Sequence, residues 1–395
     1  MISSKMEPLV RNNSVIRQMF EEGKTMAARF GTDNVFDFSL GNPNVPAPQE
    51  VNEAIIDIVR NDDPVKVHGY MSNAGFPETR RAVADNINRR FGTSFEEHNI
   101  IMTVGAGSAL NVVLKTMLDD GDEVVCLAPY FVEYGNYIRN YGGKPVVISP
   151  NPEGGFMPGF DELELKTGPK TRAVIINNPN NPTGVIYPES VIKKLASLLS
   201  KKEKEYGTVI YLIGDEPYRE LAYGGAEVPY LTKYYADTII TYSYSKSLSL
   251  PGERIGYIAV PSESDGADEF IEAATIANRV TGCVNAPSLM QLVIARCADA
   301  KCNVAYYERN GRMLYDALTG MGFDCVEPQG AFYLWVKSPV ADDKEFAAAA
   351  KKHNILLVPG SSFAGPGYVR ISYCVSYEQI MRSLTAFEAL AKEYF

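Results

Sequence analysis

A lysine surrounded by hydroxyl side chains is the residue of this sequence best suited to covalent chemistry. Lys246 lies within the stretch Ser243-Tyr-Ser-Lys-Ser-Leu-Ser-Leu-Pro-Gly-Glu-Arg254-Ile-Gly256. An amine attacks a carbonyl group when nearby positive charge lowers its pKa, and Arg254 could supply that charge. The serine hydroxyls and the arginine could also hold a dianionic phosphate. By itself, the stretch is also compatible with a solvated basic loop.

A carboxylate follows an apolar run upstream of this lysine. Residues 208–213 read as a buried strand, and Gly214-Asp215-Glu-Pro-Tyr218 follows directly. A buried carboxylate is costly unless a cation meets it. A protonated ring nitrogen of a cofactor would be such a partner, and Tyr218 could hydrogen-bond to the same ring. A helix cap or a structural ion pair would explain Asp215 equally well.

Two further strand ends carry polar groups. Residues 173–176 lead into Asn177-Asn-Pro-Asn-Asn181-Pro-Thr-Gly184, where the Asn-Pro steps favour an extended turn that presents the Asn181 amide. Residues 100–104 lead into Gly105-Ala106-Gly107 and then a helix, a junction whose free N–H groups favour an anion. Leu110 breaks the dinucleotide glycine pattern, so the junction favours a phosphate monoester.

Two more residues could contact a planar ligand with a carboxylate. Phe131 follows the strand at residues 123–127 and could stack on a ring, although large aromatics at such places usually belong to the core. Arg370 lies inside the apolar run 368–373, and its planar fork suits a bidentate carboxylate contact. Alternatively, Arg370 is an edge residue whose stem covers apolar surface.

The elements that must position these residues alternate between strands and helices. Apolar runs at 100–104, 123–127, 144–148, 173–176, 208–213 and 238–242, separated by helical patterns, predict a mostly parallel sheet covered on both faces by helices. Residues 288–315 read as one long helix that links two domains. We expect a large cofactor-binding domain at 44–300 and a smaller α+β domain formed by 1–43 and 301–395.

Composition restricts the class of protein. The chain has 395 residues, 46% hydrophobic and 22% charged, which indicates a globular protein of about two domains. A formal net charge of −10 argues against a nucleic-acid partner. The six scattered cysteines and three distant histidines favour a reduced compartment and no metal site. With no signal peptide or membrane-length run, we expect a cytoplasmic protein without a membrane partner.

Taken together, these residues resemble the pyridoxal-phosphate (PLP) aminotransferases of fold type I, class I. The stretch from Ser243 to Gly256 fits the family's lysine signature at every restricted position, and the resemblance spans nearly the whole chain. It implies a ping-pong transfer of an amino group between an L-amino acid and a 2-oxo acid through pyridoxamine phosphate. Aspartate with 2-oxoglutarate is the family's default substrate pair.

The resemblance also implies a role for each candidate residue. Lys246 would form the Schiff base with the cofactor and move the proton, and Asp215 would keep the pyridine nitrogen protonated. Asn181 and Tyr218 would bind the phenolic oxygen, and Phe131 would stack on the ring. The implied phosphate ligands are Gly105, Ala106, Gly107, Ser243, Ser245 and Arg254, with Tyr70 from the neighbouring subunit of a homodimer. Arg370, Asn181 and Gly41 would bind the substrate.

The same scaffold leaves the side chain of the substrate open. Some dicarboxylate-specific relatives carry an extra arginine shortly before the turn found here at Asn285-Ala-Pro287; Arg279 lies near that place without aligning cleanly. Phe131 also lacks the indole N–H that tryptophan would offer a distal carboxylate. Aromatic or alanine aminotransferase activity and C–S lyase chemistry are therefore alternatives. A PLP-binding regulator is a remote one, because only some forty residues precede the large domain.

Overall fold

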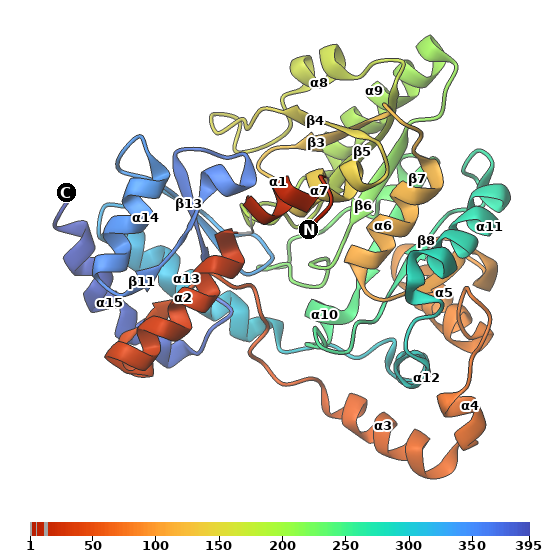
Figure 1. Cartoon of the computed structure of the whole chain (residues 1–395), viewed down its shortest axis with the longest axis horizontal. Coiled ribbons are helices and arrows are strands. Elements are labelled where there is room, and N and C mark those ends of the chain that lie inside the picture. Colours follow the sequence, from red (N-terminus) through yellow and green to blue (C-terminus); the bar gives the residue numbers. More distant parts are fainter. Residues whose placement is uncertain (1, 5, 12–14) are drawn as a thin grey trace.

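The computed structural model describes residues 2–4, 6–11 and 15–395. Residues 1, 5 and 12–14, which belong to the predicted N-terminal part of the small domain, lie outside the described residues. A seven-stranded sheet forms the larger part of the chain and a four-stranded sheet the smaller part. Figure 1 shows α10 (Tyr244–Ser247) between these two parts. In the described chain, no helix combines the length and the apolar character needed to cross a membrane.

The large sheet is mixed but mostly parallel, as predicted. In sheet order its strands are β2 (Ile100–Thr103), β8 (Gly256–Ala259), β7 (Thr238–Ser243), β6 (Tyr211–Asp215), β5 (Thr171–Asn177), β3 (Glu123–Leu127) and β4 (Lys144–Ile148). Among these seven strands, β8 alone runs in the direction opposite to the other six. The shared direction of β5, β6 and β7 brings their carboxyl ends to one edge.

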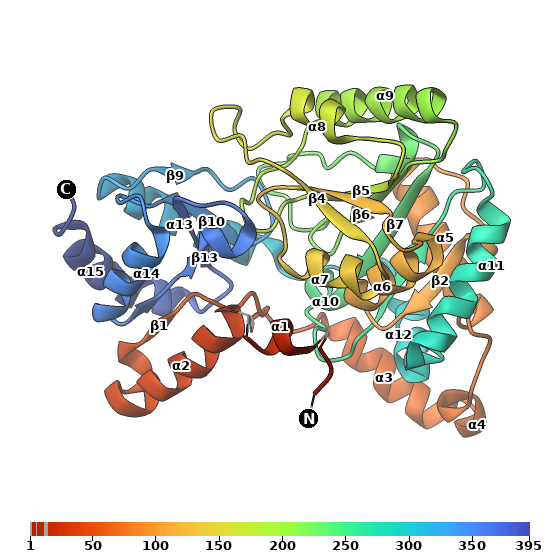
Figure 2. The same cartoon turned by 45° about the horizontal axis from the view of Figure 1, so that its top comes forward.

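Helices bury both faces of this sheet, which explains why its strands read as continuous apolar runs. Along β5, Val174 and Ile176 belong to one buried cluster while Ala173 and Ile175 belong to the other. The first face is covered by α5 (Pro77–Phe91), α8 (Phe160–Lys166), α9 (Glu189–Tyr206) and α12 (Ser288–Cys297), and α3 (Gln49–Asn61) and α4 (Pro64–His68) pack against α12. The second face is covered by α6 (Ala106–Met117), α7 (Glu133–Asn140) and α11 (Ala267–Asn278). Figure 2 shows α8 and α9 together beyond one side of the strands.

The smaller part has its own buried cluster around a second sheet. Its strands are β12 (Val358–Pro359), β13 (Tyr368–Ser372), β10 (Tyr333–Lys337) and β9 (Cys325–Val326), with β1 (Phe36–Asp37) paired to β11 (Ile355–Leu356) nearby. Its helices are α2 (Val15–Phe30), α13 (Val304–Gly320), α14 (Asp343–Lys352) and α15 (Tyr377–Ala391). The pairing of β1 with β11 joins an N-terminal segment to the C-terminal sheet.

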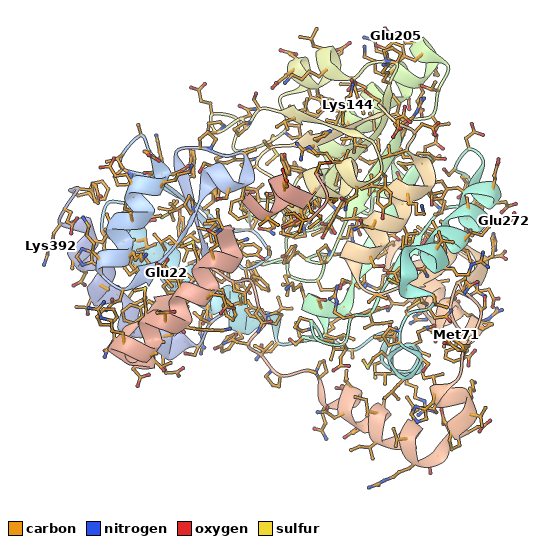
Figure 3. The ribbon with its side chains drawn as sticks, in the orientation of Figure 1. Glu22, Met71, Lys144, Glu205, Glu272 and Lys392 are labelled. Atoms are coloured by element: carbon orange, nitrogen blue, oxygen red, sulfur yellow. The ribbon has the colours of Figure 1, made fainter. Side chains whose placement is uncertain are left out.

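The remaining elements are short. They are α1 (Met6–Arg11), four 3-10 turns at η1 (Thr32–Asn34), η2 (Glu97–Asn99), η3 (Leu231–Lys233) and η5 (Gly360–Phe363), and the π-helical η4 (Arg279–Cys283). Charged side chains such as Glu205, Glu272 and Lys392 lie at the periphery, far from α10 (Figure 3).

The single long helix predicted over residues 288–315 is wrong. The chain forms α12 and α13 instead, and residues 298–303 between them are not helical. The side chain of Asn303 accepts a hydrogen bond from the backbone N–H of Tyr306 and caps the second helix, so a local cap overrides the helical periodicity. The interruption has a structural use, because the Cys302 N–H donates to the Ser247 carbonyl at 3.1 Å, next to Lys246.

Candidate active site

The carboxyl ends of three adjacent parallel strands place the first functional groups together. β5 ends at Asn177, β6 at Asp215 and β7 at Ser243, and Asn177 pairs with Asp215 in register. The Asn177 amide donates to the Asp215 carbonyl at 2.7 Å and accepts from the Asn181 N–H at 2.6 Å. Strand register therefore fixes Asp215 and the Asn181 turn relative to one another.

Lys246 lies in α10, one short helix beyond the end of β7. The Ser243 hydroxyl caps this helix by accepting from the Ser245 N–H at 3.2 Å. The Lys246 ammonium donates to the Gly41 carbonyl at 2.7 Å and stands 5.4 Å from the Phe332 ring centroid. Burial, assisted by the positive charges of Arg254 and Arg370, lowers the pKa of Lys246 to about 8. A neutral amine is thus accessible near neutral pH, as carbonyl chemistry requires.

Asp215 is buried, and its two carboxylate oxygens differ in whether they accept a hydrogen bond. The Tyr134 hydroxyl donates to Oδ2, whereas Oδ1 has no hydrogen-bond partner in the described part of the chain. Burial raises the pKa of Asp215 to about 7, with Glu216 adding to the rise and the Tyr134 hydrogen bond opposing it. A buried acceptor without a donor costs free energy, so this oxygen is suited to accept a hydrogen bond from an N–H group of a ligand.

The predicted phosphate ligands converge at the N-terminus of α6. Gly105 precedes α6 with a φ of +80°, and no side chain caps the helix, so its first N–H groups remain available for an anion. The Ser243 and Ser245 hydroxyls lie 2.8 Å apart, and Arg254 Nη1 donates to Ser245 Oγ at 3.3 Å. A Cβ atom on Gly105 would lie 2.6 Å from Arg254 Nη2 and would displace the arginine, and the positive φ independently favours glycine here.

Arg370 is a buried cation, 2% exposed, on the central strand β13. Its Nη1 donates to Asn181 Oδ1 at 3.0 Å and its Nη2 donates to the Ser39 carbonyl at 2.6 Å. Its Nε has no partner, and within the described residues no carboxylate forms an ion pair with it. Burial lowers the pKa of Arg370. Such a cation is suited to receiving a ligand carboxylate, which excludes the role of a surface edge residue.

Tyr218 and Phe131 are connected to the candidate site through two other tyrosines. The Tyr218 hydroxyl lies 2.7 Å from the Tyr333 hydroxyl, and burial raises the pKa of Tyr218 well above its ordinary value. The half-buried Phe131 ring meets the Tyr134 ring edge-on at 5.7 Å and so lies beside the partner of Asp215.

Within one chain, the Tyr70 and Arg279 side chains do not pack against the other candidate site residues. The Tyr70 side chain is 92% exposed in the loop between α4 and α5. Met71, the next residue along the chain, lies at the outer edge of the larger part of the chain, beside α12 (Figure 3). Arg279 is also exposed, at the start of the π-helical segment η4.

Sequence reasoning missed Tyr134, Tyr137 and Tyr333. A Cβ atom on Gly107 would lie 3.3 Å from the Tyr137 hydroxyl, which places Tyr137 at the start of α6. Tyr134 follows Phe131 by three residues, just inside α7, and that short separation was the one available signal. Tyr333 comes from a strand more than a hundred residues away from Tyr218, so no local pattern connects the two.

The group fits pyridoxal phosphate. The free Asp215 oxygen suits the protonated ring nitrogen, the low-pKa amine of Lys246 suits the aldehyde, and the α6 N-terminus with Arg254 suits the phosphate. The unpaired Arg370 adds a place for a substrate carboxylate.

Comparisons with known proteins agree. The family model for aminotransferase class I and II matches residues 33–387. A probable aspartate/prephenate aminotransferase of Thermus aquaticus is 33% identical over 91% of this chain and 92% of its own. An amino transferase from Eubacterium rectale superposes with a TM-score of 0.97 at 45% identity, covering 100% and 99% of the two chains. The aspartate aminotransferase of Thermus thermophilus with maleate gives 0.88 at 27% identity, covering 99% of each.

The fold-type-I architecture predicted from the sequence is therefore confirmed. The chain belongs to the class I and II aminotransferases, PLP-dependent enzymes that move an amino group between an L-amino acid and a 2-oxo acid.

Proposed function

We propose that this enzyme binds PLP through Lys246, Asp215 and the N-terminus of α6. Bound PLP supplies an electron-accepting ring and the carbonyl carbon that carries the amino group. Asp215 Oδ1 would accept a hydrogen bond from the protonated ring nitrogen, while the Tyr134 hydroxyl donates to Oδ2 and holds the carboxylate in place. Lys246 supplies the amine. The single observation that carries the proposal is the buried Asp215 oxygen without a donor, adjacent in the sheet to the strand that leads to Lys246.

The remaining cofactor contacts follow from the same edge of the sheet. The N–H groups of Ala106 and Gly107, with Ser243, Ser245 and Arg254, would hold the phosphate dianion, and Gly105 makes the turn possible. Asn181 and Tyr218 would bind the phenolic oxygen, and Phe131 would stack on the ring.

Substrate binding is assigned to Arg370, Asn181 and Gly41. The guanidinium grips the substrate α-carboxylate, and its bonds to Asn181 and the Ser39 carbonyl fix the plane of the fork. Once its bond to the Gly41 carbonyl is released, the neutral Lys246 Nζ would accept and hold the proton removed from the substrate α-carbon. The lowered pKa of Lys246 supports this role as base and acid.

We propose aspartate and 2-oxoglutarate as the substrate pair. The similarity to the Thermus aquaticus relative named as an aspartate/prephenate aminotransferase, and to the Thermus thermophilus aspartate aminotransferase structure, supports this choice. The alternative is an aromatic or alanine aminotransferase, favoured by Phe131, whose ring cannot donate to a distal carboxylate.

A half-reaction screen tests the choice of substrate. The cofactor-loaded enzyme is mixed with each of the twenty amino acids alone, and the conversion of the bound cofactor to pyridoxamine phosphate is followed by absorbance. Aspartate and glutamate should react fastest. Faster reaction with tyrosine, phenylalanine or alanine would replace the proposed pair, and release of pyruvate and ammonia would indicate C–S lyase or other β-eliminating chemistry.

We further propose a homodimer in which Tyr70 completes the phosphate site of the neighbouring subunit. The 92% exposure of Tyr70 and the exposed Val280 and Val284 support a partner on this face. Mixing inactive Tyr70→Ala and Lys246→Ala proteins tests this, because a mixed dimer would contain one site with both native residues. Recovery of activity supports the dimer, whereas two inactive proteins that stay inactive after subunit exchange contradict it.

Two further expectations belong to the same proposal. Residues 44–300 form the cofactor-binding domain, with 1–43 and 301–395 as the small domain; the seven-stranded and four-stranded sheets, which take their strands from these two parts of the chain, support this division. The enzyme works in the cytoplasm, which fractionation of the producing cells would test.

A further inference from the structure

Tyr333 occupies a junction between the cofactor side and the substrate side of the site. It is the first residue of β10, 2% exposed, and its hydroxyl lies 2.7 Å from that of Tyr218. The two rings meet at 76° with centroids 5.6 Å apart, an edge-to-face contact that fixes their relative orientation.

The face of the Tyr333 ring contacts Arg370. The guanidinium carbon lies 4.4 Å from the Tyr333 ring centroid, within the range of a desolvated cation–π contact. The hydroxyl end also packs against Gly41, where a Cβ atom would overlap it. Gly41 in turn offers its carbonyl to Lys246. One side chain therefore touches three groups of the proposed mechanism.

We propose that Tyr333 is a positioning residue that orients Tyr218 toward the cofactor through its hydroxyl and Arg370 toward the substrate carboxylate through its ring. The inference rests on the proposed roles of Tyr218 and Arg370, and it adds a residue that neither the sequence pattern nor those roles assign.

The direction of the hydrogen bond follows from donor counting. A phenol has one proton to donate. If Tyr218 donates that proton to the phenolic oxygen of the cofactor, its own oxygen must accept from Tyr333. Accepting this bond polarises the Tyr218 hydroxyl and strengthens its donation, because hydrogen bonds in a chain reinforce one another.

The Tyr333→Phe variant tests the hydroxyl alone, since it keeps the ring over Arg370. Weaker donation from Tyr218 destabilises the cofactor's phenolate form. We therefore expect the pH midpoint of the visible absorbance change of the loaded enzyme to rise by about 0.5–1 unit, as expected for one neutral hydrogen bond. The dissociation constant of succinate, an unreactive carboxylate, should stay near the wild-type value.

The Tyr333→Leu variant removes the ring as well. Loss of the cation–π contact should weaken succinate binding about fivefold beyond any change in Tyr333→Phe. Tyr373→Phe is the matched control: its hydroxyl donates to the Tyr223 hydroxyl at 3.4 Å in the same buried region, and its removal should change neither measurement.

Several outcomes would overturn the inference. Tyr333→Phe could titrate as wild type while Tyr218→Phe shifts the midpoint; the role of Tyr333 is then wrong and that of Tyr218 stands. If neither variant shifts it, the proposed function of Tyr218 itself fails. Equal succinate affinities in the Phe and Leu variants would refute the contact with Arg370. A Phe variant that cannot retain cofactor would show a structural role instead.

Discussion

Replacing Arg370 with methionine separates substrate recognition from stability. The guanidinium is almost fully buried, has no carboxylate partner among the described residues, and has its pKa lowered by burial. A buried cation without a counter-ion does not stabilise a fold by charge pairing. We therefore expect Arg370→Met to damage catalysis far more than it damages folding.

The magnitudes follow from the contacts. Removing one partner of a buried, hydrogen-bonded charge pair costs about 2–5 kcal/mol, so kcat/KM for the amino acid should fall roughly 30- to 5,000-fold. For stability, the lost bonds to Asn181 and Ser39 cost about 1–3 kcal/mol each, while relief of the desolvated charge offsets them. The net change in the free energy of unfolding should be within about 2 kcal/mol.

Arg219→Met is the matched control. Arg219 is 5% exposed but forms an ion pair with the buried Glu216, whose charge would lose its partner. That loss should cost about 3–5 kcal/mol of unfolding free energy. Steady-state kinetics and denaturant unfolding of cofactor-free protein provide the two measurements. The reasoning is refuted if Arg370→Met unfolds more easily than Arg219→Met, or if its kcat/KM is unchanged.

Two further predictions concern the cofactor side. Gly105→Ala should weaken PLP binding at least about tenfold by displacing Arg254, whereas Gly121→Ala, with a similar φ of +92° but open space around it, should leave binding intact; equilibrium titration with PLP decides. Burial raises the pKa of Asp215 to about 7, so the folded, cofactor-free protein favours the protonated carboxyl. Its free energy of unfolding should fall as the pH rises from about 4 to about 7. Asp215→Asn should remove the contribution of Asp215, and Tyr134→Phe should extend the window to higher pH, because its lower end is set by the unfolded chain; identical pH profiles for the three proteins would contradict the burial argument.

The parts of the site that follow strands were predictable from the sequence. Asn181, Asp215 and the Gly105 turn each follow an apolar run, and parallel strands necessarily bring such ends to one edge. The buried runs also predicted the sheet itself, because burial on both faces removes the alternation of polar residues.

The parts that depend on distant contacts were not predictable. Tyr134 and Tyr333 act through hydroxyls that meet partners 81 and 115 residues away, and aromatic residues in apolar surroundings look like ordinary core. The break between α12 and α13 was hidden because a single Asn303 cap decided against a continuous helical pattern.

Borohydride trapping at Lys246 tests the central claim most directly. PLP is added to the protein, the product is reduced with sodium borohydride, and the modified peptide is located by mass spectrometry. Lys202 is an internal control: its ammonium donates to Tyr206 and Glu205, which raise its pKa and keep it protonated. The account predicts one phosphopyridoxyl group on Lys246 and none on Lys202. Attachment to another lysine, or undiminished labelling of a Lys246→Ala variant, would contradict it.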